Sequence, residues 1–100
     1  MVKLVVLYGH PSDPAAFEEH YASTHGALVA KIPDLQLFEA SRVIGTPDGG
    51  DPPYYRIAEL SFESPEALQA ALASPEGQET VADLPNFASG GATVLVADVD

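Results

Sequence analysis

Residues 13–28 of this chain, DPAAFEEHYASTHGAL, have the apolar spacing of an amphipathic helix and place a tyrosine and a histidine among its apolar residues. A helix advances about 100° per residue, so one narrow face is shared by Phe17, Tyr21, Thr24, Leu28 and Ile32. His25 follows Tyr21 by one turn and lies just inside the edge of that face. A titratable side chain on a face that should be buried suggests a functional site.

The ends of this helix are also marked in the sequence. Asp13 can accept hydrogen bonds from the first free amide groups, and Pro14 suits the first helical position. Lys31 complements the dipole of the last turn, and Pro33 ends the helix. We therefore predict one helix over residues 14–32.

His25 is the candidate catalytic residue, with Tyr21 as its partner. Near neutral pH an imidazole can accept and release a proton, and a tyrosine four residues earlier can orient it or hold a substrate oxygen. The alternative is a structural histidine in the core. His20 lies about 140° around the helix from His25, so the two should not hold one metal ion together, and no metal site is predicted.

The composition restricts the class of protein. One hundred residues with 46% hydrophobic content suffice for one domain with a core, over residues 1–100. No apolar run is long enough for membrane insertion and no signal peptide is evident, while the absence of cysteine fits the cytoplasmic location that we expect. Fifteen acidic against four basic residues give a net charge of −11, which argues against nucleic acid as a partner.

The order of the other elements predicts the fold. Strand patterns occupy residues 2–8, 35–44, 54–62 and 93–99, and residues 45–53 form a loop rich in glycine, proline and aspartate. A second helix begins at Ser64 and a further start signal follows at Ser74, so we predict a bent or broken helix reaching Leu84. The β-α-β-β-α-β order favours an α+β, ferredoxin-like fold with both helices on one face of an antiparallel sheet.

The first strand predicts how the chain assembles. After Lys3 both faces of the strand over residues 2–8 are apolar, although a sheet covered on one side only would alternate with polar residues. A second subunit would cover the other face, so we expect a homodimer.

Residues 14–33, PAAFEEHYASTHGALVAKIP, resemble the first helix of EthD-type proteins of the dimeric α+β barrel superfamily, in which an aromatic residue precedes a histidine by four. The similarity continues in YRIAELSF at 55–62, SPEGQ at 74–78 and NFASGG at 86–91. Asp34 stands where relatives often have glycine. The resemblance implies two ferredoxin-like subunits that pair their sheets into an eight-stranded barrel.

The resemblance implies several activities. EthD-like proteins are named for association with a cytochrome P450 system that degrades ethyl tert-butyl ether, and the superfamily includes polyketide cyclases, lactone isomerases, cofactor-free monooxygenases and haem-binding proteins. We favour a cofactor-independent enzyme, a cyclase, isomerase, lyase or monooxygenase, in which His25 removes a proton from a hydrophobic or aromatic metabolite. The alternatives are a non-catalytic accessory subunit for a partner oxygenase and a haem protein with His25 as axial ligand.

Further residues are candidates for binding a hydrophobic small molecule. Phe17 and Leu28 share the helix face with Tyr21, and Tyr55 is a second tyrosine that could hold a substrate oxygen. The remaining candidates are Glu59, as a second proton acceptor or an edge carboxylate, and Asp83 and Phe87, which could close the pocket from the segment after the second helix.

Overall fold

The computed structural model of residues 1–100 has one antiparallel sheet of four strands in the order β2-β3-β1-β4, which confirms the predicted ferredoxin-like fold. The strands are β1 (Val2–Tyr8), β2 (Leu37–Arg42), β3 (Arg56–Phe62) and β4 (Ala92–Asp98). The helical segments are α1 (Pro14–His20), a π-helical turn η1 (Tyr21–His25), α2 (Gly26–Val29), α3 (Pro65–Ala73) and α4 (Pro75–Phe87). No helix is both long and apolar enough to cross a membrane.

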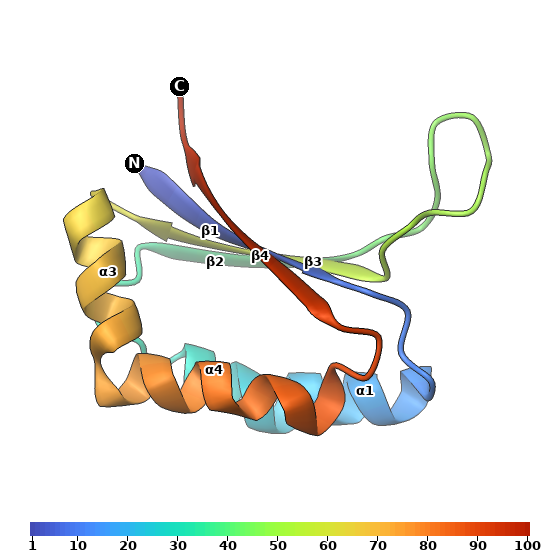
Figure 1. Ribbon diagram of the computed structural model, residues 1–100, viewed down its shortest axis with the longest axis horizontal. Coiled ribbons are helices and arrows are strands. Elements are labelled where there is room, and N and C mark those ends of the chain that lie inside the picture. Colours follow the sequence, from blue (N-terminus) through green and yellow to red (C-terminus); the bar gives the residue numbers. More distant parts are fainter.

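All helices lie on one side of the sheet, and the opposite side carries no helix (Figure 1). The buried positions of β1 alternate with half-buried ones, so Val2, Leu4, Val6 and Tyr8 point toward the helices. Their register partners on β3 include the buried Leu60 and Phe62. The core therefore lies between the sheet and the helices of one chain.

The other face of the sheet is open and carries an apolar patch beside the Lys3–Glu59 pair, and we call it the outer face. It carries Val5 and Leu7 of β1, with Ile57 of β3 and Leu95 of β4 as their register neighbours. Leu95 is 50% exposed. The largely exposed loop over residues 45–53 projects away from the helices on this same side, at the right of Figure 1. The open face agrees with the apolar pattern that the sequence shows on both sides of β1.

The first helical segment differs from the continuous helix that the sequence predicts. The amide of Gly26 donates to the carbonyl oxygen of Tyr21, five residues earlier, which is the hydrogen bond of a π turn. The extra residue shifts the buried face by one position. Thr24, expected on that face, is exposed, and Leu28 is only half-buried, whereas His25 and Val29 are buried.

The predicted break in the second helix is confirmed, because α3 and α4 are separate helices. The Ser64 hydroxyl accepts from the amide of Ala67 at 3.1 Å, and the Ser74 hydroxyl accepts from the amide of Gly77 at 3.0 Å. The second of these helices extends beyond Leu84, so Phe87 is its last residue and does not lie in a following segment as expected.

Asp34 has a φ of 62°, a left-handed conformation that glycine adopts more easily. The turn after the first helix therefore has the conformation that favours glycine, the residue that the EthD resemblance leads us to expect there.

Gly77 is required by the close approach of α3 and α4. A Cβ atom at this buried position would overlap the backbone carbonyl oxygen of Ala71, which cannot rotate away. We expect Gly77→Ala to lower the free energy of unfolding by about 1–3 kcal/mol. Urea unfolding followed by circular dichroism measures the change.

Gly26→Ala is the matched control, because a Cβ there meets only the carbonyl oxygen of Tyr21, at 3.4 Å. Alanine is favoured over glycine in helices by about 1 kcal/mol, so this variant should be neutral or slightly stabilised. Equal losses in both variants would show that the backbone contact at Gly77 does not limit the packing of the helices.

Candidate functional site

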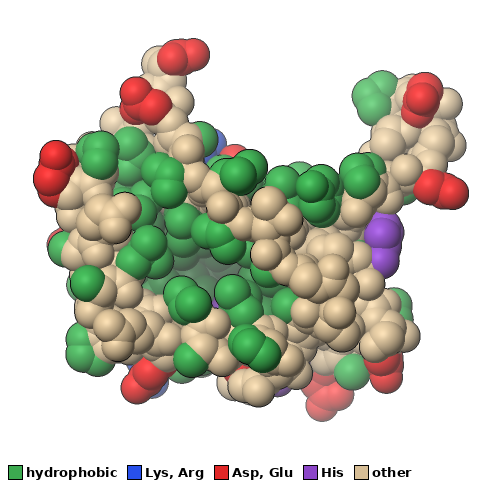
Figure 2. Space-filling view, in the orientation of Figure 1, with side chains coloured by type: hydrophobic (Ala, Val, Ile, Leu, Met, Phe, Trp, Pro, Cys, Tyr) green, Lys and Arg blue, Asp and Glu red, His purple; other side chains and the backbone are tan.

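A cavity of about 290 Å³ lies between the sheet and the helices, and 13 of its 16 lining residues are hydrophobic. Figure 2 shows its mouth as a hollow lined by hydrophobic side chains, bordered by α3, α4 and β4. Sheet residues such as Leu4, Val6 and Leu60 form one wall, and helix residues such as Val29, Leu72 and Leu84 form the other. A cavity of this size and character suits a small, mostly apolar ligand.

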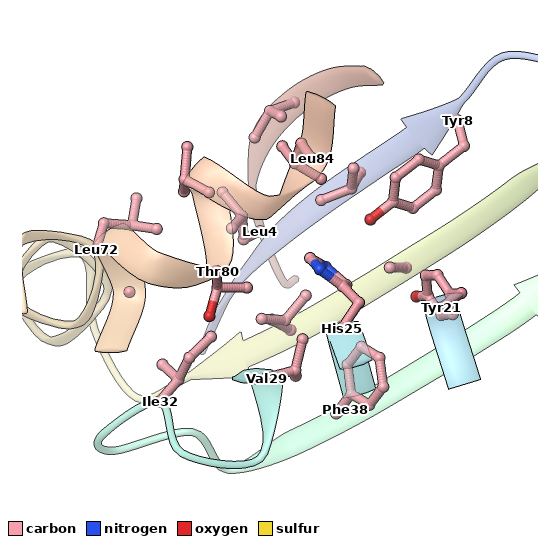
Figure 3. A pocket seen from close by; sticks show the side chains of 16 residues that line it. Leu4, Tyr8, Tyr21, His25, Val29, Ile32, Phe38, Leu72, Thr80 and Leu84 are labelled. Atoms are coloured by element: carbon pink, nitrogen blue, oxygen red, sulfur yellow. The ribbon is translucent and has the colours of Figure 1, made fainter. Parts of the chain in front are cut away.

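Three polar side chains meet at one end of the cavity (Figure 3): His25 and Tyr21 from η1 and Tyr8 from β1. Their exposed fractions are 3%, 6% and 1%, so each is enclosed by protein on most sides. Tyr8 faces the helices because it occupies an alternate position of β1, and Tyr21 and His25 occupy the face that the π turn directs inward.

Asp83 of α4 fixes the orientation of His25 through a hydrogen bond. The buried carboxylate accepts from Nδ1 of His25 at 3.0 Å, from Nε2 of His20 at 2.9 and 3.0 Å, and from the amide of Asn86 at 2.9 Å. A neutral His25 that donates from Nδ1 carries its lone pair on Nε2. Because Nδ1 is taken by Asp83, Nε2 is the nitrogen left for a ligand in the cavity.

The π turn explains why His20 and His25 reach the same carboxylate. On a regular helix they would lie about 140° apart, as the sequence analysis assumed. A π turn pairs residues five apart, and this brings the two imidazoles to Asp83 from one side of the helix. The expected placement of His20 on a separate flank is therefore wrong. His20 instead lines a second, more polar pocket at the surface.

Burial and charge set the protonation states of this cluster. Burial lowers the pKa of His25 below its usual 6.5, and this effect outweighs the hydrogen bond and the charge of Asp83, which act in the opposite direction. Burial alone would raise the pKa of Asp83, but hydrogen bonds from Asn86, His20 and His25 bring it below the usual 3.8. At neutral pH the pair is therefore a carboxylate and a neutral imidazole.

An ion pair between Arg56 and Glu18 lies next to Tyr21 and Tyr55. Arg56 donates to both carboxylate oxygens of Glu18, at 2.8 and 2.6 Å, and Tyr55 donates to the same carboxylate at 2.8 Å. The guanidinium carbon of Arg56 lies 4.6 Å from the centre of the Tyr21 ring, within the range of a cation–π contact. This cluster fixes the ring of Tyr21 against β3.

The predicted binding residues do not all reach the cavity. Phe17 stacks on Tyr21 with centroids 5.6 Å apart, and Phe87 lies 4.7 Å from the ring of His25, but both stand behind the lining. Tyr55 is held by Glu18 outside the lining, and Leu28 is absent from it. Glu59 lies on the outer face of the sheet, 3.4 Å from Lys3.

Two residues of the candidate site carry little signal in the sequence. Tyr8 resembled any other apolar residue of a strand, and only the alternation of β1 indicated that it faces inward. For Asp83 the sequence predicts a residue that closes the pocket and does not predict its contacts with two histidines. Its spacing from Thr80 and Phe87, three and four residues, is the signal that it shares the buried face of α4.

The lining of the cavity offers haem no counter-ion. The lining contains no lysine or arginine to pair with the carboxylates of the macrocycle, and Arg56, behind Tyr21, is already paired with Glu18. The residues that line the cavity match a small neutral ligand better than an anionic cofactor.

Comparison with known proteins gives the family. The EthD domain model matches residues 10–91. An uncharacterised 11.0 kDa protein of Rhodococcus erythropolis, encoded in the thcB–thcC intergenic region, is 48% identical over 98 residues, covering 98% of this chain and 94% of that protein.

Solved structures agree with this assignment. The crystal structure of an EthD family protein from Bacillus halodurans is 36% identical, with a TM-score of 0.94 and coverage of 100% of this chain and 99% of that one. SnoaB of Streptomyces nogalater, a cofactor-independent oxygenase, shares the fold at 20% identity and a TM-score of 0.70, covering 98% and 91% of the two chains. The chain with the buried His25–Asp83 pair is a member of the EthD family.

Proposed function

We propose that this protein is a cofactor-independent enzyme that transfers a proton on a hydrophobic carbonyl or enol compound, with His25 as the general base. One observation carries the proposal: His25 is 3% exposed, binds Asp83 through Nδ1, and borders an apolar cavity. A base in this position works on the ligand and is shielded from bulk water.

In the proposed step, Nε2 of His25 takes a proton from a carbon next to the carbonyl group. The imidazolium that forms keeps the proton on Nδ1 and donates it in a hydrogen bond to Asp83. The negative charge of Asp83, 3.0 Å from Nδ1, stabilises the imidazolium. The electron pair of the broken C–H bond moves to the substrate oxygen, and the hydroxyl of Tyr21 donates to that oxygen. Return of the proton to a different atom completes an isomerisation. In a cyclisation the enolate carbon instead attacks a second carbonyl carbon of the same molecule, and the oxygen of that carbonyl takes the proton from Nε2.

The same first step serves several reaction types, namely isomerase, cyclase, lyase and cofactor-free oxygenase. The similarity to SnoaB concerns the fold alone. A non-catalytic accessory protein is the competing function, and the long apolar part of the cavity favours it as much as it favours an enzyme. The carboxylate behind His25 favours the enzyme, because ligand binding alone has no need of an oriented base.

We further propose that the protein acts as a homodimer whose two outer faces meet. Val5, Leu7, Ile57 and Leu95 provide apolar side chains for such a contact, and Leu95 is 50% exposed. The cavity lies on the opposite side of the sheet, so pairing through the outer face leaves its lining intact.

His25→Ala should abolish catalysed proton exchange. Neutral aryl ketones such as phenylacetone, incubated with the protein in D2O, should gain deuterium next to the carbonyl, followed by NMR. Loss of the base should reduce the rate by about 10²–10⁴-fold, and Asp83→Asn should also reduce it, because the imidazole loses its orienting anion.

His10→Ala is the control for this experiment, because Nε2 of His10 contacts the carbonyl oxygen of Pro52, outside the cavity. Its exchange rate should equal that of the unmodified protein. Ketones that bind in the cavity but exchange no faster than in free imidazole would contradict the enzyme and leave the accessory protein.

The depressed pKa of His25 gives the protein a defined loss of stability in acid. Between pH 6.5 and the lower pKa of the folded state, the unfolded chain binds more protons than the folded one, so the free energy of unfolding falls as the pH decreases. From pH 7.5 to 5.5 the loss should be smaller in His25→Gln, measured by urea unfolding. Identical pH dependence in the two proteins would show that His25 is not held neutral by the fold.

Leu95→Glu should weaken the dimer. Sedimentation of the unmodified protein should give a dimer that buries at least about 1,200 Å² in total. The control is Ala82→Glu on α4, because Ala82 is exposed on the helix side and does not line the cavity. A monomer at micromolar concentration, or equal effects of the two variants, would argue against pairing through the outer face.

A further inference from the structure

Two phenol groups share the polar end of the cavity, and the proposed proton transfer uses only one of them. The rings of Tyr8 and Tyr21 lie perpendicular with centroids 5.7 Å apart. In Figure 3 the hydroxyl oxygens of Tyr8 and Tyr21 point toward the part of the cavity next to His25. The two donors come from different layers, Tyr8 from the sheet and Tyr21 from the helices, so a ligand atom that contacts both hydroxyls would be held by both layers.

The hydroxyl of Tyr21 is buried and completes no hydrogen bond within the chain, although the hydroxyl of Tyr8 is near enough to affect its pKa. Tyr21 is 6% exposed, and a buried hydroxyl without a partner carries a desolvation cost that an oxygen of a ligand would remove. Burial raises the pKa of both Tyr8 and Tyr21, so each keeps its proton at neutral pH and can donate it. This end of the cavity is thus built to donate hydrogen bonds.

The charges near this end disfavour an anionic ligand. Arg56 is the register partner of Tyr8 and packs on the ring of Tyr21, but its charge is paired with Glu18, to which Nη2 donates twice, while its buried Nε has no partner. Asp83 lies directly behind His25 with its pKa lowered, so it is a carboxylate. An anion entering the cavity would lose its hydration, meet no cation in the lining and approach the negative charge of Asp83, while Arg56 outside the lining is already paired with Glu18.

We propose that Tyr8 and Tyr21 together form a site for one neutral oxygen atom, and that the protein selects apolar ligands with a single ketone, aldehyde or phenol group over carboxylates. The hydrophobic remainder of the lining accommodates the body of such a ligand and offers little to a second polar group. Tyr8 is thereby a specificity-determining residue. The inference rests on the proposed function for the location of the site.

Three probes with the same ring test this selectivity: acetophenone with a neutral oxygen, ethylbenzene without oxygen, and benzoate with a charge. Dissociation constants at pH 7.5 come from NMR titration of the whole protein. Acetophenone should bind about three- to tenfold more tightly than ethylbenzene, as expected for one or two neutral hydrogen bonds. Benzoate should bind at least tenfold more weakly than acetophenone.

Tyr8→Phe and Tyr21→Phe separate hydrogen bonding from ring packing. Each should weaken acetophenone by about two- to tenfold and leave ethylbenzene unchanged, because only a hydroxyl is lost. Tyr55→Phe is the matched control, since the Tyr55 hydroxyl contacts Glu18 and is not part of the lining. It should leave the ratio of acetophenone to ethylbenzene affinity as it is in the unmodified protein.

Benzoate binding as tightly as acetophenone would overturn the proposal. So would equal affinity for acetophenone and ethylbenzene, or a Tyr8→Phe variant that weakens both alike. These experiments measure binding without turnover. Selective binding of acetophenone with no deuterium exchange would therefore contradict the proposed catalysis and leave the neutral-oxygen site standing, whereas exchange without this selectivity would do the reverse.

Discussion

The carboxylate of Asp83 is the constraint on which the rest of the candidate site depends. A buried anion is costly unless hydrogen bonds satisfy it, and here His20, His25 and Asn86 all contact it within 3.0 Å. The same contacts fix α4 against η1. Because Asp83 accepts from Nδ1 of His25, Nε2 is the nitrogen available to a ligand. The hydrogen bond that satisfies the buried carboxylate therefore also orients the proposed base.

The π turn makes this arrangement possible. A regular helix would bury Thr24 in place of His25 and would separate the two histidines. One extra residue in the turn brings both imidazoles to Asp83 and places Val29 in the cavity wall. π turns of this kind occur often at functional sites, where a local irregularity redirects a side chain that the fold alone would leave outside.

Sequence patterns predicted the fold better than the site. Proline after Asp13, Ser64 and Ser74 marked three helix starts, and the apolar alternation of β1 indicated which residues face the helices. The π turn left no such signal, because its cost is offset by contacts with α4 that are distant in sequence. Helical periodicity placed Tyr21 and His25 near a cavity. It could not place Leu28 correctly, because it does not contain the π turn. It also could not reveal the contact of Glu59 with Lys3 or of Asp83 with the two histidines, because these contacts join segments distant in sequence.

The tautomer of His25 tests the central claim most directly. Nitrogen NMR of the imidazole rings at pH 7.5, with assignment by comparison to His25→Gln, distinguishes a protonated nitrogen from one with a free lone pair. We expect a neutral ring with the proton on Nδ1, hydrogen-bonded to Asp83, and a free lone pair on Nε2. A proton on Nε2, or an imidazolium at this pH, would contradict it.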